Sequence, residues 1–418
     1  FWLKFSFFKF RPVREEHFKP HLQCNMSSGG EESEEEIVDL SNPDVTTKYM
    51  TGAEITQKAL QAVIEACVPG ADVVELCVLG DQLLTDGTAK VYNKKDVKNK
   101  TKIEKGIAFP TCISVNEILG HFSPFRGESR QLNPGDVVKV DLACHIDGFI
   151  AAAAHTVVLP NAEGEPVGDR RADVVHSAWT AAEAALRLVQ VGKKNTEVTD
   201  MFQKASGDFE CNMMQGVLSH QLKKHVIDGN RVIIGKPTQD EKVDEFEFEA
   251  NEVYCIDVVV STGEGKGKET DTRSTVFKRA VENSYGLKTQ KARQFISEVN
   301  KFFPTLPFTL RAISDEQVAR IGVSESLRHE LLNEYPVLKE RDGVFVAQFK
   351  YTVLLLPGGT KKVTGLPFTQ GELLTSQFSP KDEELVALLR TSANPKKSKK
   401  KSKKPKDGEE KDDEKTDS

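Results

Sequence analysis

Long apolar runs are missing from this 418-residue sequence. A helix that crosses a bilayer needs roughly 18 or more consecutive apolar residues, and the strongest candidate, Phe149 to Leu159, is interrupted by His155. Hydrophobic residues make up 38% of the chain and charged residues 29%. These values are typical of a soluble globular protein with polar extensions, and the length allows two ordinary domains or one large domain with tails. We expect no insertion into a membrane.

Paired cysteine motifs are also missing. The seven cysteines are scattered, their number is odd, and none forms a CxxC pair. A zinc ribbon and a disulfide framework are therefore disfavoured, and a reducing intracellular compartment is the better interpretation.

The first 25 residues lack a methionine and an uninterrupted apolar stretch. Lys4 and Lys9 divide the aromatic start FWLKFSFFKF, which argues against a signal peptide. Acidic residues are absent before Glu15, so a transit peptide remains an alternative. Our interpretation is an upstream translated segment, with the natural start at Met26.

Charge of one sign gathers at both ends of the chain. Residues 31–36 include five glutamates, and eight of the eleven residues from Lys396 to Lys406 are lysine, before a final acidic stretch. Neither end carries enough apolar surface to repay the entropy of ordering. We therefore expect disordered segments at 1–44 and 395–418 around a folded domain at 45–394.

Helix and strand patterns alternate within this domain. Helices are expected at 51–67 and 170–191, a hairpin at 136–159, and strands at 252–260 and 344–356. Thr51 can cap the first helix, and Asp147-Gly148 is a strong signal for a two-residue hairpin turn. Segment 265–340 is more helical and basic and looks like an insertion. Two rounds of helix followed by strands predict an α/β domain with internal pseudo-symmetry.

Several strings, in order along the chain, resemble type II methionine aminopeptidases. They are GIAFPTCISVNEILGHFSP (106–124), VVKVDLACHIDGFI (137–150), GVLSH (216–220), EVYCIDVVVSTGEG (252–265) and VAQFKYTVLL (346–355). The resemblance implies the α/β (α+β) pita-bread fold of these enzymes, with pseudo-two-fold symmetry. It also implies that His121 occupies the place of a conserved histidine in the substrate site.

Two metal ions in such an enzyme require several carboxylates and hold the water that attacks the substrate. The resemblance implies a ligand set of Asp, Asp, His, Glu and Glu. The matching positions in this chain hold Asp141, Ala152, His220, Asp257 and Lys350. Counting across the hairpin turn puts Asp141 and residue 152 on one face of the sheet, but Ala152 offers no ligand. Lys350 replaces an anion with a cation that cannot coordinate a metal while protonated.

These substitutions predict a chain without peptidase activity, without catalytic residues and without a cofactor. Asp141 could still bind one metal ion, but an ion pair between an aspartate and Lys350 is the expected arrangement, since buried charges are normally paired. His121 and His220 could keep ligand-binding roles or could be hydrogen-bonded residues of the cleft. A working metal-dependent aminopeptidase remains the alternative hypothesis.

The whole pattern is most similar to the proliferation-associated, ErbB-receptor-binding protein family. This similarity is carried by VTTKYMTGAEI (45–55), by SHQLKKHVIDG (219–229) and by the lysine-rich end. It implies a non-enzymatic adaptor for structured RNA, ribosomes and regulatory proteins, including receptor cytoplasmic segments, in growth, translation, transcription and ribosome biogenesis. It also implies a location in cytoplasm, nucleus and nucleolus. A peptide- or histone-binding pseudo-peptidase would differ only in its partner.

Two basic elements could contact RNA phosphates. In the insertion we expect contacts from Lys266, Lys268, Lys278, Arg279, Lys288, Lys291 and Arg293, and in the tail from Lys396, Lys397, Lys399, Lys400, Lys401, Lys403, Lys404 and Lys406. The insertion interleaves its cations with aromatic residues, as RNA-binding patches do, although acidic residues there also fit a plain surface. A run of lysines attracts phosphates or directs a chain to the nucleus, whereas a solvated linker is the alternative.

Leu385, Leu388 and Leu389 form an LxxLL pattern near the end of the domain. Such a helix can dock in the groove of a protein partner. Apolar residues at helical spacing also fill cores, and packing within the chain remains the alternative.

Overall fold

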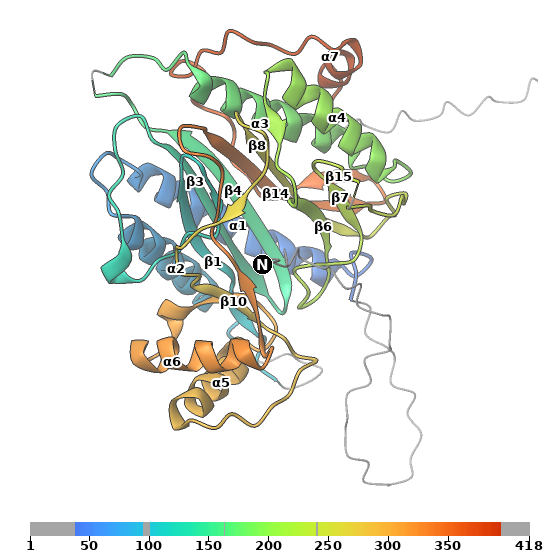
Figure 1. Cartoon of the computed structure of the whole chain (residues 1–418). Helices are drawn as coiled ribbons and strands as arrows, with labels where there is room; N and C mark the ends of the chain where they lie inside the picture. The colour runs from blue at the N-terminus through green and yellow to red at the C-terminus, as the bar shows by residue number, and fades with distance from the viewer. Residues whose placement is uncertain (1–37, 95–100, 163, 240, 394–418) are drawn as a thin grey trace, which may run out of the picture.

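The computed structural model describes residues 38–94, 101–162, 164–239 and 241–393. At its centre lies a nine-stranded antiparallel sheet, whose main path runs β1-β3-β4-β14-β8-β6-β7, with β15 beside β14 and β5 beside β8 (Figure 1). Its strands are β1 (Lys105–Val115), β3 (Val137–Ile146), β4 (Phe149–Val158), β5 (Asn212–Met213), β6 (Leu218–Leu222), β7 (Val232–Ile234), β8 (Val253–Ser261), β14 (Val346–Leu356) and β15 (Gly359–Lys362). Every residue of β3 and β4 is buried, so both faces of the sheet are covered there.

The expected hairpin is confirmed. Asp147 and Gly148 have φ values of 56° and 78°, the left-handed conformation that a two-residue type I′ turn requires at both positions. The turn fixes a register in which Asp141 lies opposite Ala154. The expected strands at 252–260 and 344–356 correspond to β8 and β14.

Four helices pack around this sheet: α1 (Pro43–Ala66), α2 (Val73–Ala89), α3 (Arg170–Leu188) and α4 (Asn195–Asp208). The expected start of the first helix was wrong. Asn42 caps it by accepting a hydrogen bond from the amide of Asp44, and Pro43 occupies its first turn. The hydroxyl of Thr51 instead donates to the carbonyl of Thr47 inside the helix.

One face of the sheet is covered by α1 and α3. The Thr56 hydroxyl of α1 donates to the carbonyl of Ala151 (3.0 Å), and the Tyr351 hydroxyl donates to Ala182 of α3 (2.6 Å). Successive side chains of a strand point to opposite faces. Ala152 follows Ala151 in the sequence and Lys350 precedes Tyr351. The side chains of Ala152 and Lys350 therefore point to the face of the sheet away from these two helices.

Residues 265–340 fold into a module whose core also takes in Phe125 of the main body (Figure 1, α5, α6 and β10). It contains β9 (Lys268–Glu269), β10 (Val276–Arg279), α5 (Gln290–Phe302), β11 (Phe308–Thr309), the 3₁₀ turn Leu310–Ala312, α6 (Glu316–Arg328), β12 (Leu332–Tyr335) and β13 (Leu338–Lys339). Phe277, Phe295 and Phe308 are buried in its core. Strand β13 also pairs with β2 (Ile118–Gly120), which ties the module to the main body.

The remaining described elements are a 3₁₀ turn at Arg126–Glu128 and the short helix α7 (Glu383–Leu389). Within the described ranges, no helix is both long and apolar enough to cross a membrane.

Burial of His155 predicts acid sensitivity. Its ring packs edge-on against Phe349 in the core, and burial lowers the pKa of His155 to about 4. Because the unfolded chain binds the proton with a pKa of about 6.5, stability is lost as the pH falls below that value. Between pH 7 and 5 this histidine should remove about 2 kcal/mol from the free energy of unfolding. Urea titrations of wild type and His155→Leu at both pH values test this, since an equal loss in both proteins would exclude His155 as the cause.

Candidate functional site

The five positions of the metal-ligand pattern lie on one face of the sheet, in two neighbouring rows. In the first row Asp141 is opposite Ala154, Ala154 is opposite Lys350, and Lys350 is opposite Asp257. Each of these pairs belongs to adjacent strands, so the three charged side chains point to the same side of the sheet.

The second row lies two residues along each strand. His220 of β6 is opposite Cys255, which is two residues from Asp257 on the same face. Ala152 follows the same two-residue step from Ala154, and its backbone exchanges hydrogen bonds with the Thr352 hydroxyl (3.0 Å each). The expected placement of Asp141 and residue 152 on one face is confirmed.

Lys350 lies between the two aspartates of the first row. Its Nζ is 2.5 Å from Oδ2 of Asp141 and 3.0 Å from Oδ2 of Asp257. The three side chains are only 12%, 8% and 12% exposed, and Gln348 donates a further hydrogen bond to Asp257 (2.8 Å). The ion pair expected from the sequence is confirmed, and it involves both aspartates.

The two neighbouring carboxylates keep the side chain of Lys350 protonated. Burial alone would lower the pKa of Lys350, but the carboxylates of Asp141 and Asp257 outweigh burial and raise that pKa well above its ordinary value. An ammonium group therefore occupies the space between two carboxylates that point toward one another. Within the described parts of the chain, no three His, Cys, Asp or Glu side chains are grouped so that they could hold a metal ion. The residues do not fit a pair of divalent cations.

An aromatic wall stands beside Lys350. The Phe109 ring centroid is 5.6 Å from Nζ of Lys350, and the rings of His121 and Tyr335 pack with Phe109 and with each other. Nδ1 of His121 is 3.0 Å from the carbonyl of Pro336. Burial lowers the pKa of His121, so the ring is neutral at pH 7 and acts as a hydrogen-bonded wall residue.

His220 closes the other side of the site. Burial lowers the pKa of His220, and its Nδ1 is buried without a hydrogen-bond partner, as is Oδ1 of Asp141. Nearby, Asp228 accepts from Lys278 (2.5 Å) and from the Tyr335 hydroxyl (3.2 Å). Asp228, Phe109 and Tyr335 were not predicted as site residues from the sequence. Asp228 stands in the matched string SHQLKKHVIDG and Phe109 in the matched string at 106–124, and these strings were the available signal.

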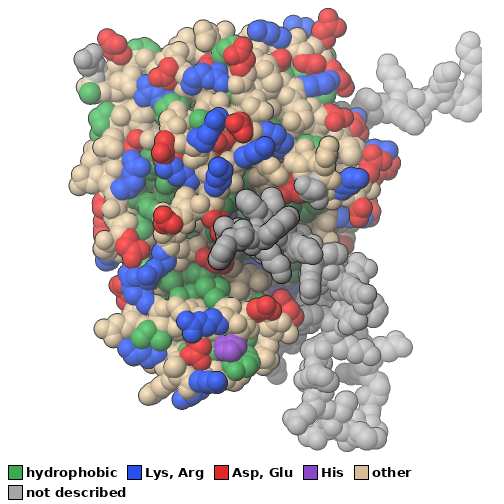
Figure 2. Space-filling view, viewed as in Figure 1, with side chains coloured by type: hydrophobic (Ala, Val, Ile, Leu, Met, Phe, Trp, Pro, Cys, Tyr) green, Lys and Arg blue, Asp and Glu red, His purple; other side chains and the backbone are tan. Residues whose placement is uncertain are grey.

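The basic residues of the insertion do not form one surface. Lys278 is bound to Asp228, and the Arg279 guanidinium donates to the carbonyls of Leu331 (2.9 Å) and Asn283 (2.8 Å), so both cations serve internal contacts. Their expected role at an RNA surface is not supported by this placement. Figure 2 shows lysine and arginine interspersed with acidic side chains over the face that it draws.

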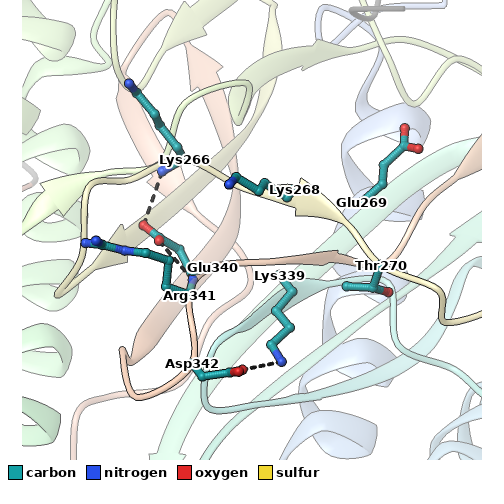
Figure 3. A pocket seen from close by; sticks show the side chains of 8 residues that line it. All are labelled: Lys266, Lys268, Glu269, Thr270, Lys339, Glu340, Arg341 and Asp342. Carbon is teal, nitrogen blue, oxygen red and sulfur yellow. Dashed lines mark hydrogen bonds and ion pairs between the residues drawn. The ribbon is translucent and has the colours of Figure 1, made fainter. Parts of the chain in front are cut away.

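Lys266 and Lys268 instead share a hollow of about 450 Å³ with Lys339 and Arg341, and its lining also includes the acidic residues Glu269, Glu340 and Asp342 (Figure 3). Beneath it the buried carboxylate of Glu340 accepts hydrogen bonds from the backbone amides of Gly265 (2.7 Å) and Lys266 (3.2 Å). Because Glu340 holds this glycine-rich loop from inside, the lysine side chains of the loop remain exposed.

The other basic residues of the insertion that were expected to contact RNA lie apart from this hollow. Lys288 is exposed, Lys291 donates to Gln317 (3.0 Å), and Arg293 donates to the carbonyls of Leu287 (3.2 Å) and Lys288 (2.6 Å), all near the start of α5. The lysines from 396 to 406 lie outside the described residues.

The LxxLL leucines belong to α7. Leu385 is fully buried, and Leu388 and Leu389 pack against the same core. In this arrangement the three leucines fill the core of their own chain, as the packing alternative expects, and they are not presented to a partner.

Known proteins resemble this chain along most of its length. Residues 47–276 match metallopeptidase family M24. The chain is 48% identical to ErbB-3 binding protein 1 of Solanum tuberosum, over 88% of this chain and 92% of the relative. It is 44% identical to proliferation-associated protein A of Dictyostelium discoideum (90% and 97% covered) and 38% identical to the curved DNA-binding protein of Schizosaccharomyces pombe (86% and 94%).

Solved structures show the same architecture. The structure of a thermophilic Arx1 aligns with a TM-score of 0.78 at 28% identity, over 85% of this chain and all of that one. Methionine aminopeptidase from Thermotoga maritima aligns with a TM-score of 0.51 at 16% identity, over 78% of this chain and 99% of that one, which shows the fold alone. A methionine aminopeptidase of Talaromyces stipitatus is 26% identical in sequence, over 78% of this chain and 72% of that protein.

These relationships confirm the pita-bread fold, and the relation to the aminopeptidases is the more distant one. With nearly half of its residues identical to a relative over most of both chains, this chain belongs to the ErbB-3 binding protein 1 and proliferation-associated protein A family, within the M24 peptidase fold.

Proposed function

We propose that this chain is a non-enzymatic adaptor that binds structured RNA, ribosomes and regulatory proteins. The observation that carries the non-enzymatic half is the ammonium group of Lys350, which lies between Asp141 and Asp257. A peptidase of this fold needs divalent cations at that place to polarise the carbonyl and activate water. An internal cation on a fixed side chain neutralises the carboxylates but offers no open coordination position.

The RNA half of the proposal rests on exposed cations. Lys266 and Lys268 lie in the open beside a hollow, and the lysine-rich tail adds eight cations in eleven residues. Such groups bind phosphates through release of counterions and give little base specificity. The name of the Schizosaccharomyces pombe relative, curved DNA-binding protein, fits a nucleic-acid partner. The name ErbB-3 binding protein 1 fits a partner among receptor cytoplasmic segments.

The proposed setting is the cytoplasm, nucleus and nucleolus, where structured RNA and ribosomes occur together. Ultraviolet crosslinking in cells, followed by sequencing of the RNA recovered with this chain, tests the proposal. We expect enrichment of base-paired RNA. Recovery no greater than with an M24 peptidase that lacks a lysine-rich tail would contradict the RNA half.

The active peptidase is the second candidate, favoured by the match to family M24. Metal analysis of the purified chain separates the two. We expect fewer than two tightly bound cobalt, manganese or zinc ions per chain, and no chelator-sensitive removal of methionine from a Met-Ala peptide, because Lys350 repels cations and Ala152 offers no ligand. Two tightly held ions, or such a cleavage, would overturn the non-enzymatic proposal.

A matched variant makes the metal measurement more decisive. Ala152→Asp together with Lys350→Glu restores carboxylates at both substituted positions of the pattern, and the scaffold already places them on one face. We expect this double variant to bind cobalt or manganese where the wild type does not, with a methionine aminopeptidase as the positive control.

A further inference from the structure

The C-terminal strap, residues 370–389, is fastened across the outside of α3 and α4. Its Gln370 side chain exchanges hydrogen bonds with the backbone of Val158 (2.9 Å each), and Ser376 donates to Asp173 of α3 (2.7 Å). The strap ends in α7, which lies beside α4 in Figure 1. Beyond α7 the sequence continues into the lysine-rich tail.

One carboxylate binds the backbone of the residues that precede α7. Oδ2 of Asp208, at the end of α4, accepts hydrogen bonds from the amides of Lys381 (2.6 Å) and Asp382 (3.0 Å). Asp382 in turn caps α7 by accepting from the amides of Glu384 and Leu385 (3.0 Å each). The fully buried Leu385 depends on this cap for its position.

Ser379 lies in the strap just before these contacts, and Pro380 follows it. The residue is exposed, and in the part of the chain that the structure describes its hydroxyl has no hydrogen-bond partner. A residue before proline favours an extended backbone. An accessible, extended Ser-Pro step is what proline-directed protein kinases require of a substrate.

The sequence contains a second Ser-Pro step, which serves as an internal comparison. Ser123, before Pro124, is 1% exposed, donates to the carbonyl of Thr111 (2.7 Å) and accepts from Arg311 (2.8 Å). A kinase cannot reach it in the folded chain. The two Ser-Pro dipeptides therefore differ in their accessibility to a kinase, although their sequences are the same.

Charge around Ser379 opposes an added phosphate. Adjacent Cα atoms are 3.8 Å apart, so Ser379 and Lys381 are at most about 7–8 Å apart, within a Debye length at physiological salt. Asp208, Asp382, Glu383 and Glu384 contribute four carboxylates near the α7 cap, against the ammonium groups of Lys204 and Lys381. The guanidinium of Arg170 also lies near, over the ring of Phe378, but it is paired with Asp173 (2.9 Å). Lys204 is already paired with Asp382 and Glu384.

We propose that Ser379 is a phosphorylation site for a proline-directed kinase and that its modification loosens the strap from α4. In the reaction a bond forms between Ser379 Oγ and the γ-phosphorus of ATP, the bond from that phosphorus to the bridging oxygen breaks, and ADP leaves. The hydroxyl proton passes to the catalytic base of the kinase. The phosphate carries a charge of about −1.5 to −2 at pH 7, which repels Asp208 and weakens its hold on the two amides.

The first experiment treats the full chain with ATP and a cyclin-dependent kinase complex, and peptide mass spectrometry locates the product. We expect one phosphate on Ser379, none in Ser379→Ala or Pro380→Ala, and none on Ser123 unless the chain is denatured first. A folded chain that remains unmodified, while a synthetic peptide of residues 373–385 is modified, would overturn the proposal.

The second experiment measures hydrogen exchange of the modified chain. We expect the amides of residues 381–386 to exchange roughly fivefold faster than in the unmodified chain, the effect of losing about one helix cap. Exchange in α1 should not change, and kinase-treated Ser379→Ala should behave as the untreated wild type. Full phosphorylation with unchanged exchange in the strap would exclude the loosening.

Discussion

Replacing Lys350 by methionine should destabilise this protein by about 3–5 kcal/mol, because it leaves two buried carboxylates without their cation. Methionine is close to lysine in length and apolar, so the change removes charge with little loss of volume. The Lys350 ammonium lies within 3.0 Å of both Asp141 and Asp257, near the middle of β14. Urea or thermal unfolding measures the effect.

The pH dependence of this variant gives a second readout. In the wild type, the pKa of Lys350 is raised by Asp141 and Asp257, so its contribution is fully present below the unfolded value of about 10.4 and is lost only as the pH rises through the folded pKa. Between pH 5 and 8 it should be constant. Burial raises the pKa of Asp141, and Lys350 opposes that effect, so in Lys350→Met the variant should lose stability as the pH rises across this window.

Two further variants show whether unpaired charge is the cause. Adding Asp141→Asn and Asp257→Asn to Lys350→Met removes the stranded carboxylates and should restore most of the loss, since an apolar or neutral replacement of a whole buried pair is often tolerated. Lys58→Met breaks an exposed pair with Glu54 on α1 and should leave the melting temperature almost unchanged, because water screens such pairs. If Lys350→Met melts like Lys58→Met, the buried ion pair contributes no stability.

Local signals in the sequence were sufficient to predict the hairpin and the face of the sheet on which its side chains lie. Asp147-Gly148 dictates a turn of known length, and a strand repeats every two residues, so the side of Asp141 and Ala152 follows by counting. The first helix shows the limit of such reasoning. Thr51 and Asn42 are both acceptable caps, and only the packing of Val45 and Tyr49 in the core decides that the helix begins at Pro43.

Contacts between distant segments could not be predicted from local patterns. Lys278 looks like any other cation of the insertion, yet its partner Asp228 lies 50 residues away in the sequence. Lys350 is 209 residues from Asp141, and only the resemblance to a known site suggested that they meet. Whether a lysine or arginine lies inside the protein or on its surface depends on whether a hydrogen-bond acceptor lies near it. Distant parts of the chain provide that acceptor, so the local sequence does not reveal it.

RNA binding should respond differently to the two basic elements. Deleting residues 395–418 removes the eight-lysine run, and we expect weaker binding with a shallower dependence on salt. Each lost phosphate contact reduces the slope of log affinity against log salt by about 0.9 for duplex nucleic acid. Tethering the tail beside a folded site raises its effective concentration, so its loss should reduce affinity by about tenfold or more at low salt.

The folded element should set the preference for structured RNA. Lys266 and Lys268 stand beside a fixed hollow, whereas a run of lysines can follow any strand of phosphates. Neutralising Lys266, Lys268, Lys288 and Lys291 to glutamine should therefore reduce the preference for hairpin over single-stranded RNA. The tail deletion should preserve that preference.

Titrations at several salt concentrations decide between these outcomes. A variant with Lys58, Lys193, Lys194 and Lys204 changed to glutamine has the same change in net charge, placed on α1, just before α4 and on α4, and should keep both affinity and preference. Lys278→Gln removes an internal partner of Asp228, so it should lower the melting temperature more than it changes RNA binding at a temperature where the chain is folded. If all neutralised variants lose affinity equally, binding depends on net charge alone, and the hollow beside Lys266 has no special part in it.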